Sequence, residues 1–411
     1  MKKCRTAQEG PASRITEPVR TLLWEWVVES GLKALAHQLE AERAALCGAR
    51  YARVAKRGAA RAGTVPSAVV LGGRKVAVRR PRVRAGGREV PLPSFAAFAA
   101  TDPLSARAVE QMLVGVATRQ YARSLEPVGR SSHATSKSAV SRRFVAATQA
   151  QLDAWRSRPL DHHHLLALYL DGVHFGPHCL VVALGVDTAG QKHVLGLWAG
   201  STENATVCRD LLSNLQERGL PTDRSLLVVL DGSKALAKAV REVFGRAAWI
   251  QRCQVHKRRN VVSYVALTEQ ALVRTTLRRA YSEQDPSVAK RLLLDLARRL
   301  DPTAPAAAAS LREGLEDTLT VLAVPGPARL RRSLASTNVI EALMARLRST
   351  HRHVKRWRHE RMALRWAAAG IGEASRGFHR LFGARDLKPL LRALACRDQE
   401  LGLNVVSRVA A

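Results

Sequence analysis

Two aspartates lie within or directly after apolar segments that are typical of buried strands. Asp171 follows Leu-Ala-Leu-Tyr-Leu, with Val173 and Phe175 continuing the apolar pattern, and Asp231 follows Leu-Leu-Val-Val-Leu. Burying a carboxylate is unfavourable by several kcal/mol unless a cation or hydrogen bonds compensate for it. The two positions therefore indicate a site that handles positive charge.

Each aspartate also has a structural explanation when it is taken alone. Asp171 precedes a glycine, and Asp-Gly is a strong hairpin signal, although Gly176-Pro177 is the better turn. Asp231 stands at a strand-to-helix junction, where an acid makes a good helix N-cap. Taken together, the pair favours a shared site over two unrelated turns.

The segments around the two aspartates predict a mixed five-stranded sheet. We expect strands at 166–175, 179–187, 191–200, 225–232 and 248–252, and helices at about 204–218 and 233–244. In a sheet of this order the first and fourth strands are neighbours, so both carboxylates converge at adjacent strand ends. Two such acids raise each other's pKa unless a divalent cation lies between them. Mg²⁺ prefers oxygen ligands, and phosphodiester chemistry with two metals needs bridging carboxylates.

Glu341 is the candidate for a third acid, on a helix whose apolar face includes Ile340 and Leu343. The alternative is a capping box, with Asn338 as N-cap and Glu341 three residues later. A basic run follows directly and favours a helix laid along DNA with the acid facing the metals. Its candidate DNA contacts are Arg346, Arg348, Arg352, Lys355 and Arg356.

The charge balance narrows the class of partner. The 411 residues include 66 Lys and Arg against 34 Asp and Glu, a formal net charge of +32. Such an excess repels itself in a compact fold, so we expect a polyanionic partner, with nucleic acid first and a membrane surface second. No long apolar span or signal peptide is evident, and the six cysteines form no paired framework, which favours a reducing cytoplasm.

The N-terminal part predicts a DNA-binding region in three pieces. Residues 1–64 have a helical pattern, 65–102 form a short basic β-rich segment, and 103–160 resemble a helix-turn-helix. Thr135 or Ser136 is the expected N-cap of its second helix. The candidate base or phosphate contacts at the start of that helix are Lys137, Ser138, Arg142 and Arg143. A plain amphipathic packing helix, a solvated basic face and an ordinary capped basic helix are the alternatives.

The remaining chain predicts a sheet-containing core followed by helices. The core starts at 161 and its first part ends at 258; after His256 no strand signal returns. We expect an all-helical segment at 259–335, core helices carrying Glu341 at 336–385, and a tail helix within 386–411, over Lys-Pro-Leu-Leu-Arg to Gln-Glu-Leu.

The joint pattern resembles the mutator-type transposases of bacterial insertion sequences, a DDE transposase family. The resemblance runs through Asp-Gly-Val-His-Phe-Gly at Asp171, Leu-Asp-Gly-Ser-Lys at Asp231 and Ser-Thr-Asn-Val-Ile-Glu at Glu341, and covers most of residues 100 to 385 in order. The family's Cys-x-x-His signature falls on Cys253 and His256. The chain departs from the family pattern at Ala205–Cys208 and Gly232–Ala235, beside the triad.

The resemblance implies an α/β RNase H-like catalytic core, a mixed five-stranded sheet with helices, interrupted by an all-helical insertion. It implies that Asp171, Asp231 and Glu341 form the catalytic triad and hold two Mg²⁺ ions, with Mn²⁺ as a substitute. The expected reaction is cleavage at terminal inverted repeats and joining of 3′ ends to target DNA, in many members through a circular intermediate. A homodimer acting at the bacterial nucleoid is the expected form.

Two other functions fit parts of the sequence. A catalytically silent transposase serving as a DNA-binding repressor would keep the basic surface, and an RNase H-like nuclease would cut without joining. Cys253 and His256 have no convincing second pair of zinc ligands, so a structural or DNA-facing role is favoured for them over zinc.

Overall fold

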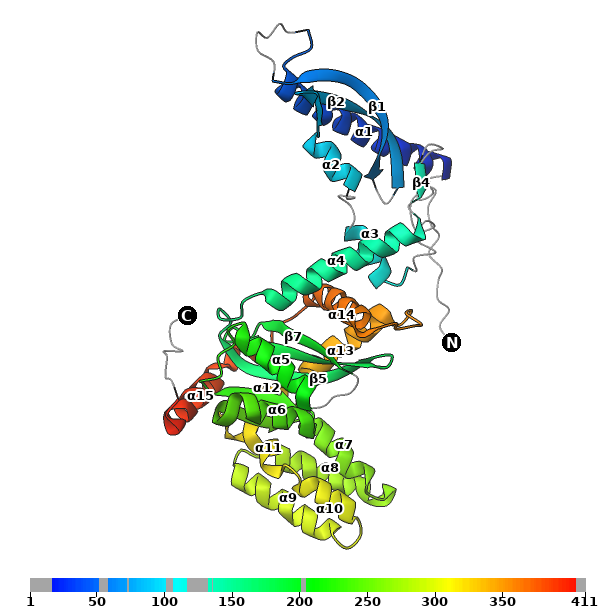
Figure 1. Cartoon of the computed structure of the whole chain (residues 1–411). Coiled ribbons are helices and arrows are strands. Elements are labelled where there is room, and N and C mark those ends of the chain that lie inside the picture. Colours follow the sequence, from blue (N-terminus) through cyan, green and yellow to red (C-terminus); the bar gives the residue numbers. More distant parts are fainter. Residues whose placement is uncertain are drawn as a thin grey trace. The chain divides into compact units, whose positions relative to one another are not determined.

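The computed structural model describes residues 17–51, 58–71, 74–100, 106–116, 132–134, 136–200 and 205–403 (Figure 1). The chain divides into two compact units, with the boundary between Ala147 and Thr148, and each unit is described by itself. Within the described ranges, no helix is both long enough and apolar enough to span a bilayer.

The first unit packs a long helix on a small antiparallel sheet. Helices α1 (Glu17–Cys47), α2 (Pro93–Ala100) and α3 (Ala106–Leu113) accompany strands β1 (Ala60–Leu71), β2 (Arg74–Ala85), β3 (Arg88–Val90) and β4 (Ser132–Ala134). The sheet order is β1-β2-β3, and β4 also pairs with β2. The core is apolar and consists of Leu35, Leu39, Cys47, Val69, Val83 and Leu92.

The structure changes two expectations for this unit. The strand β1 begins at Ala60, inside the segment that was expected to be helical to residue 64, because residues 60–71 pair with β2 in a long hairpin. Of the basic side chains on β2, Arg80 and Arg82 form ion pairs with Glu89, so part of this face is internally neutralised.

The expected helix-turn-helix at 103–160 falls partly outside the described residues. Residues 103–105, 117–131 and Thr135 are outside them. The second helix is α4 (Lys137–Ser157), and the Ser136 hydroxyl accepts a hydrogen bond from the Ala139 N–H at 3.3 Å. Ser136 is therefore the cap that the structure describes, and the strand β4 precedes it.

The second unit is built on a five-stranded mixed sheet with the order β7-β6-β5-β8-β9. The strands are β5 (Leu165–Phe175), β6 (His178–Asp187), β7 (Lys192–Gly200), β8 (Leu226–Leu230) and β9 (Ala248–Arg252). The first three form an antiparallel meander, and β5 pairs in parallel with β8, which pairs in parallel with β9. The predicted adjacency of the first and fourth strands is confirmed.

Strand alternation divides the core of the sheet into two faces. Leu168 and Leu170 of β5 belong to the apolar cluster formed with α5 (Ala205–Glu217) and α6 (Lys234–Phe244). Since successive side chains of a strand point to opposite faces, Tyr169 and Asp171 face the other side. Helix α13 (Asn338–His351) packs against β5, and the Tyr169 hydroxyl donates to the Ser333 carbonyl at 3.1 Å.

The chain between the sheet and α13 is helical. It comprises α7 (Gln254–Ser263), α8 (Leu267–Ser282), α9 (Pro286–Leu300), α10 (Pro305–Arg312), α11 (Leu315–Leu319) and α12 (Ala328–Leu334). Lys257 of α7 is buried, and its ammonium donates to the carbonyls of Ser310 and Glu313, which ties α7 to the end of α10. Burial lowers the pKa of Lys257 to about 8.

Two further helices complete the unit: α14 (Glu360–Ser375), which packs against α13 and β7, and the tail helix α15 (Lys388–Leu401), whose bounds agree with the sequence prediction. The basic run after Glu341 was expected to continue as one helix. In the structure α13 ends at His351 and α14 begins at Glu360, so this expectation is wrong and residues 352–359 connect the two helices.

Replacing Gly196 with alanine should destabilise the second unit. A Cβ at this position of β7 would lie 2.5 Å from Cδ1 of Leu211 and 2.8 Å from Cδ2 of Leu215, both on α5. Overpacking of this kind costs about 1–3 kcal/mol. Urea unfolding should show this loss for Gly196→Ala, whereas Gly31→Ala on α1, where the new Cβ meets nothing within 4 Å, should not lower stability. Equal stability of Gly196→Ala and wild type would contradict the tight α5–sheet packing.

Candidate active site

Asp171 and Asp231 occupy corresponding positions on neighbouring parallel strands. The register between β5 and β8 runs from Ala167 opposite Leu227 to Leu170 opposite Leu230, so each aspartate directly follows the last residue that pairs between these two strands. Both side chains are half-buried. The residues that pair between the two strands are buried and uncharged, so the two carboxylates are the first acidic groups beyond the paired segment.

The hydrogen bonds of the two aspartates answer the turn and cap alternatives. Asp171 lies inside β5, its Oδ1 accepts from the Gly172 N–H at 2.9 Å, and the hairpin turn comes later, at Gly176-Pro177. Asp231 Oδ1 accepts from the Ser233 N–H at 2.8 Å. The N-cap of α6 is Ser233, not Asp231. Neither carboxylate is therefore needed as the turn or the cap that was considered for it.

The surroundings of Asp171 disfavour the charged form of its carboxyl group. Burial and, after it, the Asp231 carboxylate raise the pKa of Asp171 to about 7, and Glu341 acts in the same direction with a smaller effect. The Gly172 N–H and His256 lower this pKa, but by less than burial and Asp231 raise it. The fold therefore brings the three acids into electrostatic range of one another, and their mutual repulsion would be relieved by a cation.

Glu341 reaches this region from α13, on the face of the sheet toward which Asp171 points. Its Oε1 accepts a hydrogen bond from the Thr337 hydroxyl at 2.8 Å and lies 3.8 Å from Nδ1 of His256. The N-cap of α13 is Thr337, and Asn338 is the first helical residue, so the expected capping box with Asn338 as N-cap is wrong. The threonine takes the cap position because its own N–H and hydroxyl are both engaged by Cys253.

Cys253 fastens the start of α13 to the start of α7. It is fully buried at the N-cap of α7, and its Sγ accepts from the N–H of His256 at 3.5 Å and from the N–H and hydroxyl of Thr337, each at 3.4 Å. The neighbouring Cys253 side chain and, more weakly, the Glu341 carboxylate raise the pKa of His256. The Cys-x-x-His pair thus contacts the same threonine that holds Glu341.

The acids fit a divalent cation by their chemistry. Two aspartates and a glutamate supply the oxygen ligands that Mg²⁺ prefers, and the raised pKa of Asp171 marks the uncompensated negative charge that a cation would offset. Within the described part of the chain, however, no three Asp, Glu, His or Cys side chains lie together closely enough to form a ligand set.

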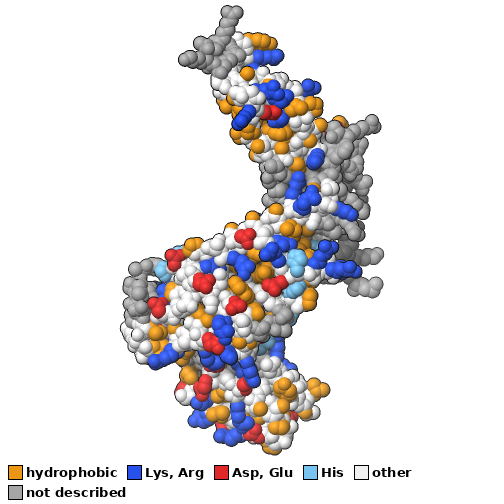
Figure 2. All heavy atoms as spheres, in the orientation of Figure 1, with side chains coloured by type: hydrophobic (Ala, Val, Ile, Leu, Met, Phe, Trp, Pro, Cys, Tyr) orange, Lys and Arg blue, Asp and Glu red, His pale blue; other side chains and the backbone are white. Residues whose placement is uncertain are grey.

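The candidate DNA contacts on α4 belong to the exposed start of that helix. Lys137, Ser138 and Arg142 are exposed, whereas Arg143 is half-buried. None of these four side chains forms an ion pair with a described residue. Figure 2 shows Lys and Arg side chains on the visible surface of both units.

The candidate DNA contacts after Glu341 divide between a helix and a connection. Arg346 is partly committed, since its Nη1 donates to the carbonyls of Ala374 and Gly377 at 3.1 and 3.3 Å. Arg348 lies in the last turn of α13, and Arg352, Lys355 and Arg356 lie beyond it; these four are exposed.

An aromatic cluster fixes the connection after α13. The ring of Phe175 lies 4.0 Å from that of His351 and 5.2 Å from that of Trp357. Gly176, with φ +59°, lets Trp357 approach so closely that a Cβ would lie 2.4 Å from the indole Cδ1. Seating Trp357 on the hairpin in this way turns the chain, which explains why the basic run does not remain one helix.

Thr337 is the site residue that sequence reasoning missed. It is fully buried and bonds to Cys253, contacts Nδ1 of His256 at 3.3 Å and donates to Glu341. The sequence did contain a signal, because a threonine stands four residues before an acid at the start of a helix. The N-cap was nevertheless assigned to Asn338.

Known proteins resemble this chain over most of its length. The family model described as "Transposase, Mutator family" matches residues 25–379. The transposase for insertion sequence element IS905 of Lactococcus lactis is 28% identical over 250 residues, 59% of this chain and 61% of the relative, less than two thirds of its length. The transposase for ISRM5 of Rhizobium meliloti is 28% identical over 316 residues, 75% of this chain and 78% of the relative. The transposase for IS256 in transposon Tn4001 of Staphylococcus aureus is 28% identical over 269 residues, 61% and 65%.

The raised pKa of Asp171 predicts a pH-dependent stability in the presence of a chelator. The native pKa of about 7 lies above the unfolded value near 3.8, so between these values the native state binds more protons than the unfolded state. Stability should fall by about 1–3 kcal/mol as the pH rises from 4 to 8. Denaturant titrations at each pH should show a flatter profile for Asp171→Asn and an unchanged one for Asp210→Asn, an exposed acid of α5. The same slope in Asp171→Asn and wild type would show that Asp171 is not the group responsible.

The link between Cys253 and Glu341 can be tested at Thr337. Thr337→Val removes the hydroxyl that donates to Glu341 at 2.8 Å and lies 3.4 Å from the Cys253 sulfur, and should destabilise the protein by about 1–2 kcal/mol. Thr337→Ser keeps the hydroxyl and should lose less. Urea unfolding of the three proteins measures both effects, and a valine variant as stable as the serine variant would argue against the hydroxyl as the link.

Proposed function

This chain belongs to the Mutator family of transposases, and we propose that it cleaves the ends of a bacterial insertion sequence and joins the freed 3′ ends to target DNA. The observation that supports the proposal is the position of Asp171 and Asp231 at the same end of the paired segments of β5 and β8, where Asp231 and, more weakly, Glu341 raise the pKa of Asp171. The named relatives are themselves insertion-sequence transposases.

Asp171, Asp231 and Glu341 would hold two Mg²⁺ ions, for which Mn²⁺ could substitute. When bound, such ions polarise an attacking water or 3′-hydroxyl and stabilise the leaving oxygen of a phosphodiester. The acids' own part is to set the position and charge of that site. Thr337 orients Glu341 by its hydrogen bond, and buried Cys253 holds Thr337 in place.

The arrangement of the sheet supports an RNase H-like core. Three antiparallel strands followed by two parallel ones, with helices on both faces, carry two of the acids on neighbouring strands. The helices α8–α12 correspond to the all-helical insertion expected from the resemblance to mutator-type transposases. In the sequence they lie between Asp231 and Glu341.

In this proposal, DNA binds to basic surfaces that lie outside the site of Asp171, Asp231 and Glu341. The start of α4, as the recognition helix of a helix-turn-helix, and the connection at 352–359 contact the terminal inverted repeats. Two element ends are brought together by a homodimer at the nucleoid. The net charge of +32 supports a polyanionic substrate of this kind.

Changing the acids should separate catalysis from binding. Asp171→Asn, Asp231→Asn and Glu341→Gln should each lower Mg²⁺-dependent cleavage and joining of terminal-repeat duplexes by at least about a hundredfold. Binding of the same duplex, followed by fluorescence anisotropy, should persist, because the basic surfaces are intact. Asp210→Asn serves as a control and should retain activity.

The same assay separates the alternatives. A wild-type protein that binds the ends without cutting them would be a repressor, and one that cuts without giving joined product with plasmid would be a nuclease. Full strand transfer by Asp171→Asn would end the assignment of the triad.

A further inference from the structure

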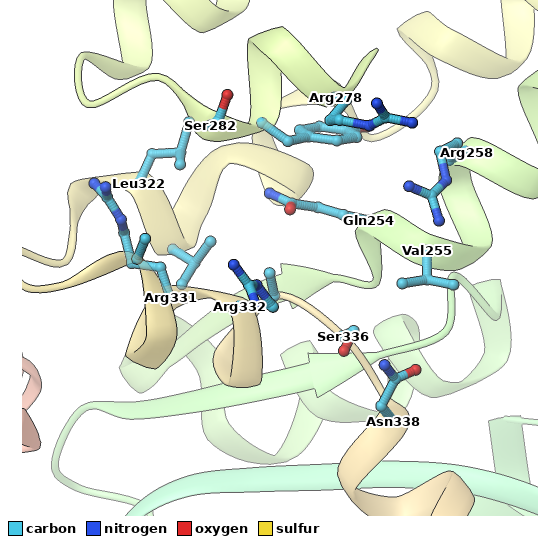
Figure 3. A pocket seen from close by; sticks show the side chains of 14 residues that line it. Gln254, Val255, Arg258, Arg278, Ser282, Leu322, Arg331, Arg332, Ser336 and Asn338 are labelled. Atoms are coloured by element: carbon cyan, nitrogen blue, oxygen red, sulfur yellow. The ribbon is translucent and has the colours of Figure 1, made fainter. Parts of the chain in front are cut away.

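A cavity of about 480 Å³ lies beside the start of α13, between α7, α8 and α12. Figure 3 shows its lining, with Arg258 and Arg278 on one side, Arg331 and Arg332 on another, and Gln254 between them. The cavity lies entirely within the second unit and is separate from the three acids.

The charge of the lining is of one sign. Four arginines from three helices border the cavity, and no Asp or Glu does. Among the described residues, none of the four guanidinium groups forms an ion pair. Neighbouring arginines of the same helices do: Arg279 pairs with Glu283 on α8, and Arg329 of α12 pairs with Asp386. Four like charges around one cavity, two of them on exposed side chains, give it a positive potential that attracts a polyanionic ligand.

The rest of the lining is apolar or able to hydrogen-bond. Val255, Val321, Leu322 and Ala335 contribute apolar surface, and Tyr281 adds an aromatic ring. Exposed Asn338 adds a side-chain amide. A ligand that matches this lining has anionic groups at one part and a flat, weakly polar body at another.

A nucleotide of DNA has this composition. The cavity has the volume of a small-molecule site, so it suits one unit of a strand better than the broad backbone of a duplex. Proteins bind unstacked nucleotides by combining arginine contacts to phosphates with aromatic or apolar contacts to the base.

We propose that this cavity binds a single nucleotide unstacked from the DNA substrate, with its flanking phosphates among the four arginines and its base against Tyr281 and Leu322. The proposal rests on the proposed function for its source of DNA. The cavity adjoins the acid site through the chain itself: Gln254 follows Cys253, and Asn338 follows Thr337, whose hydroxyl bonds to Glu341.

The test compares two probes with the full-length protein in EDTA, so that no cleavage occurs. One probe is a fluorescein-labelled, fully paired 30-base-pair duplex, and the other is the same duplex with one extra unpaired adenine. The variant Arg278→Ala/Arg331→Ala/Arg332→Ala should lose at least about tenfold more affinity for the unpaired probe than for the paired one.

The matched control removes the same charge from the helical segment outside the cavity. Arg274→Ala/Arg291→Ala/Arg299→Ala should weaken binding of both probes equally, as expected for non-specific phosphate contacts. A cavity variant that also weakens both probes equally would overturn the proposal. Thermal unfolding of both variants identifies a loss that comes from misfolding, in which case the three single cavity variants replace the triple one.

Two further measurements identify the bound group. Replacing the unpaired adenine with 2-aminopurine reports its environment, and Tyr281→Leu should change the fluorescence obtained with wild type. Free dAMP should compete with the unpaired probe only weakly; strong competition, without preference for unpaired DNA, would assign the cavity to a free nucleotide and overturn the proposal. Because every arm is a binding measurement in EDTA, a protein that fails to cleave or join DNA would refute the proposed function and leave these results interpretable.

Discussion

Repulsion between carboxylates on neighbouring strands is the constraint around which the second unit is organised. The apolar residues of β5 and β8 hold the two strands in a fixed parallel register, and that register sets Asp171 beside Asp231. Burial and the neighbouring acids raise the pKa of Asp171 to about 7, so the arrangement is unfavourable for an ionised pair. The sheet provides the stability that keeps the acids together, and a bound cation would remove the repulsion.

Glu341, the third acid, is positioned by hydrogen bonds that connect the start of α7 to the start of α13. The chain leaves the sheet at Cys253, runs through α7–α12 and returns at Thr337, and there the cysteine sulfur accepts hydrogen bonds from the threonine. Gln254 N–H also donates to the Ala335 carbonyl at 2.9 Å, beside the same link. The position of Glu341 therefore depends on contacts between the points where the chain leaves and returns to the sheet.

The sequence was sufficient where local pattern decides the structure and insufficient where a distant contact does. The five strands, the pairing of the first with the fourth, and the tail helix followed from apolar runs and turn residues. The cap of α13 did not, because Thr337 is selected over Asn338 by Cys253, a partner far away in the chain. The end of α13 could not be predicted either. Trp357 packs against Gly176 of the hairpin, and this contact leaves no trace in the helical periodicity of the sequence.

Within the part of the chain that the structure describes, the positive charge is neutralised by acids in some places and left unpaired in others. Glu89, Glu313 and Asp386 each pair with at least one arginine, so acids neutralise particular places. Among the described residues, the charged side chains that border the cavity beside α13 are all arginines. A nucleotide held there would contact Asn338, the first residue of the helix that carries Glu341. Occupation of the cavity would then act on the same helix start that holds the third acid through Thr337.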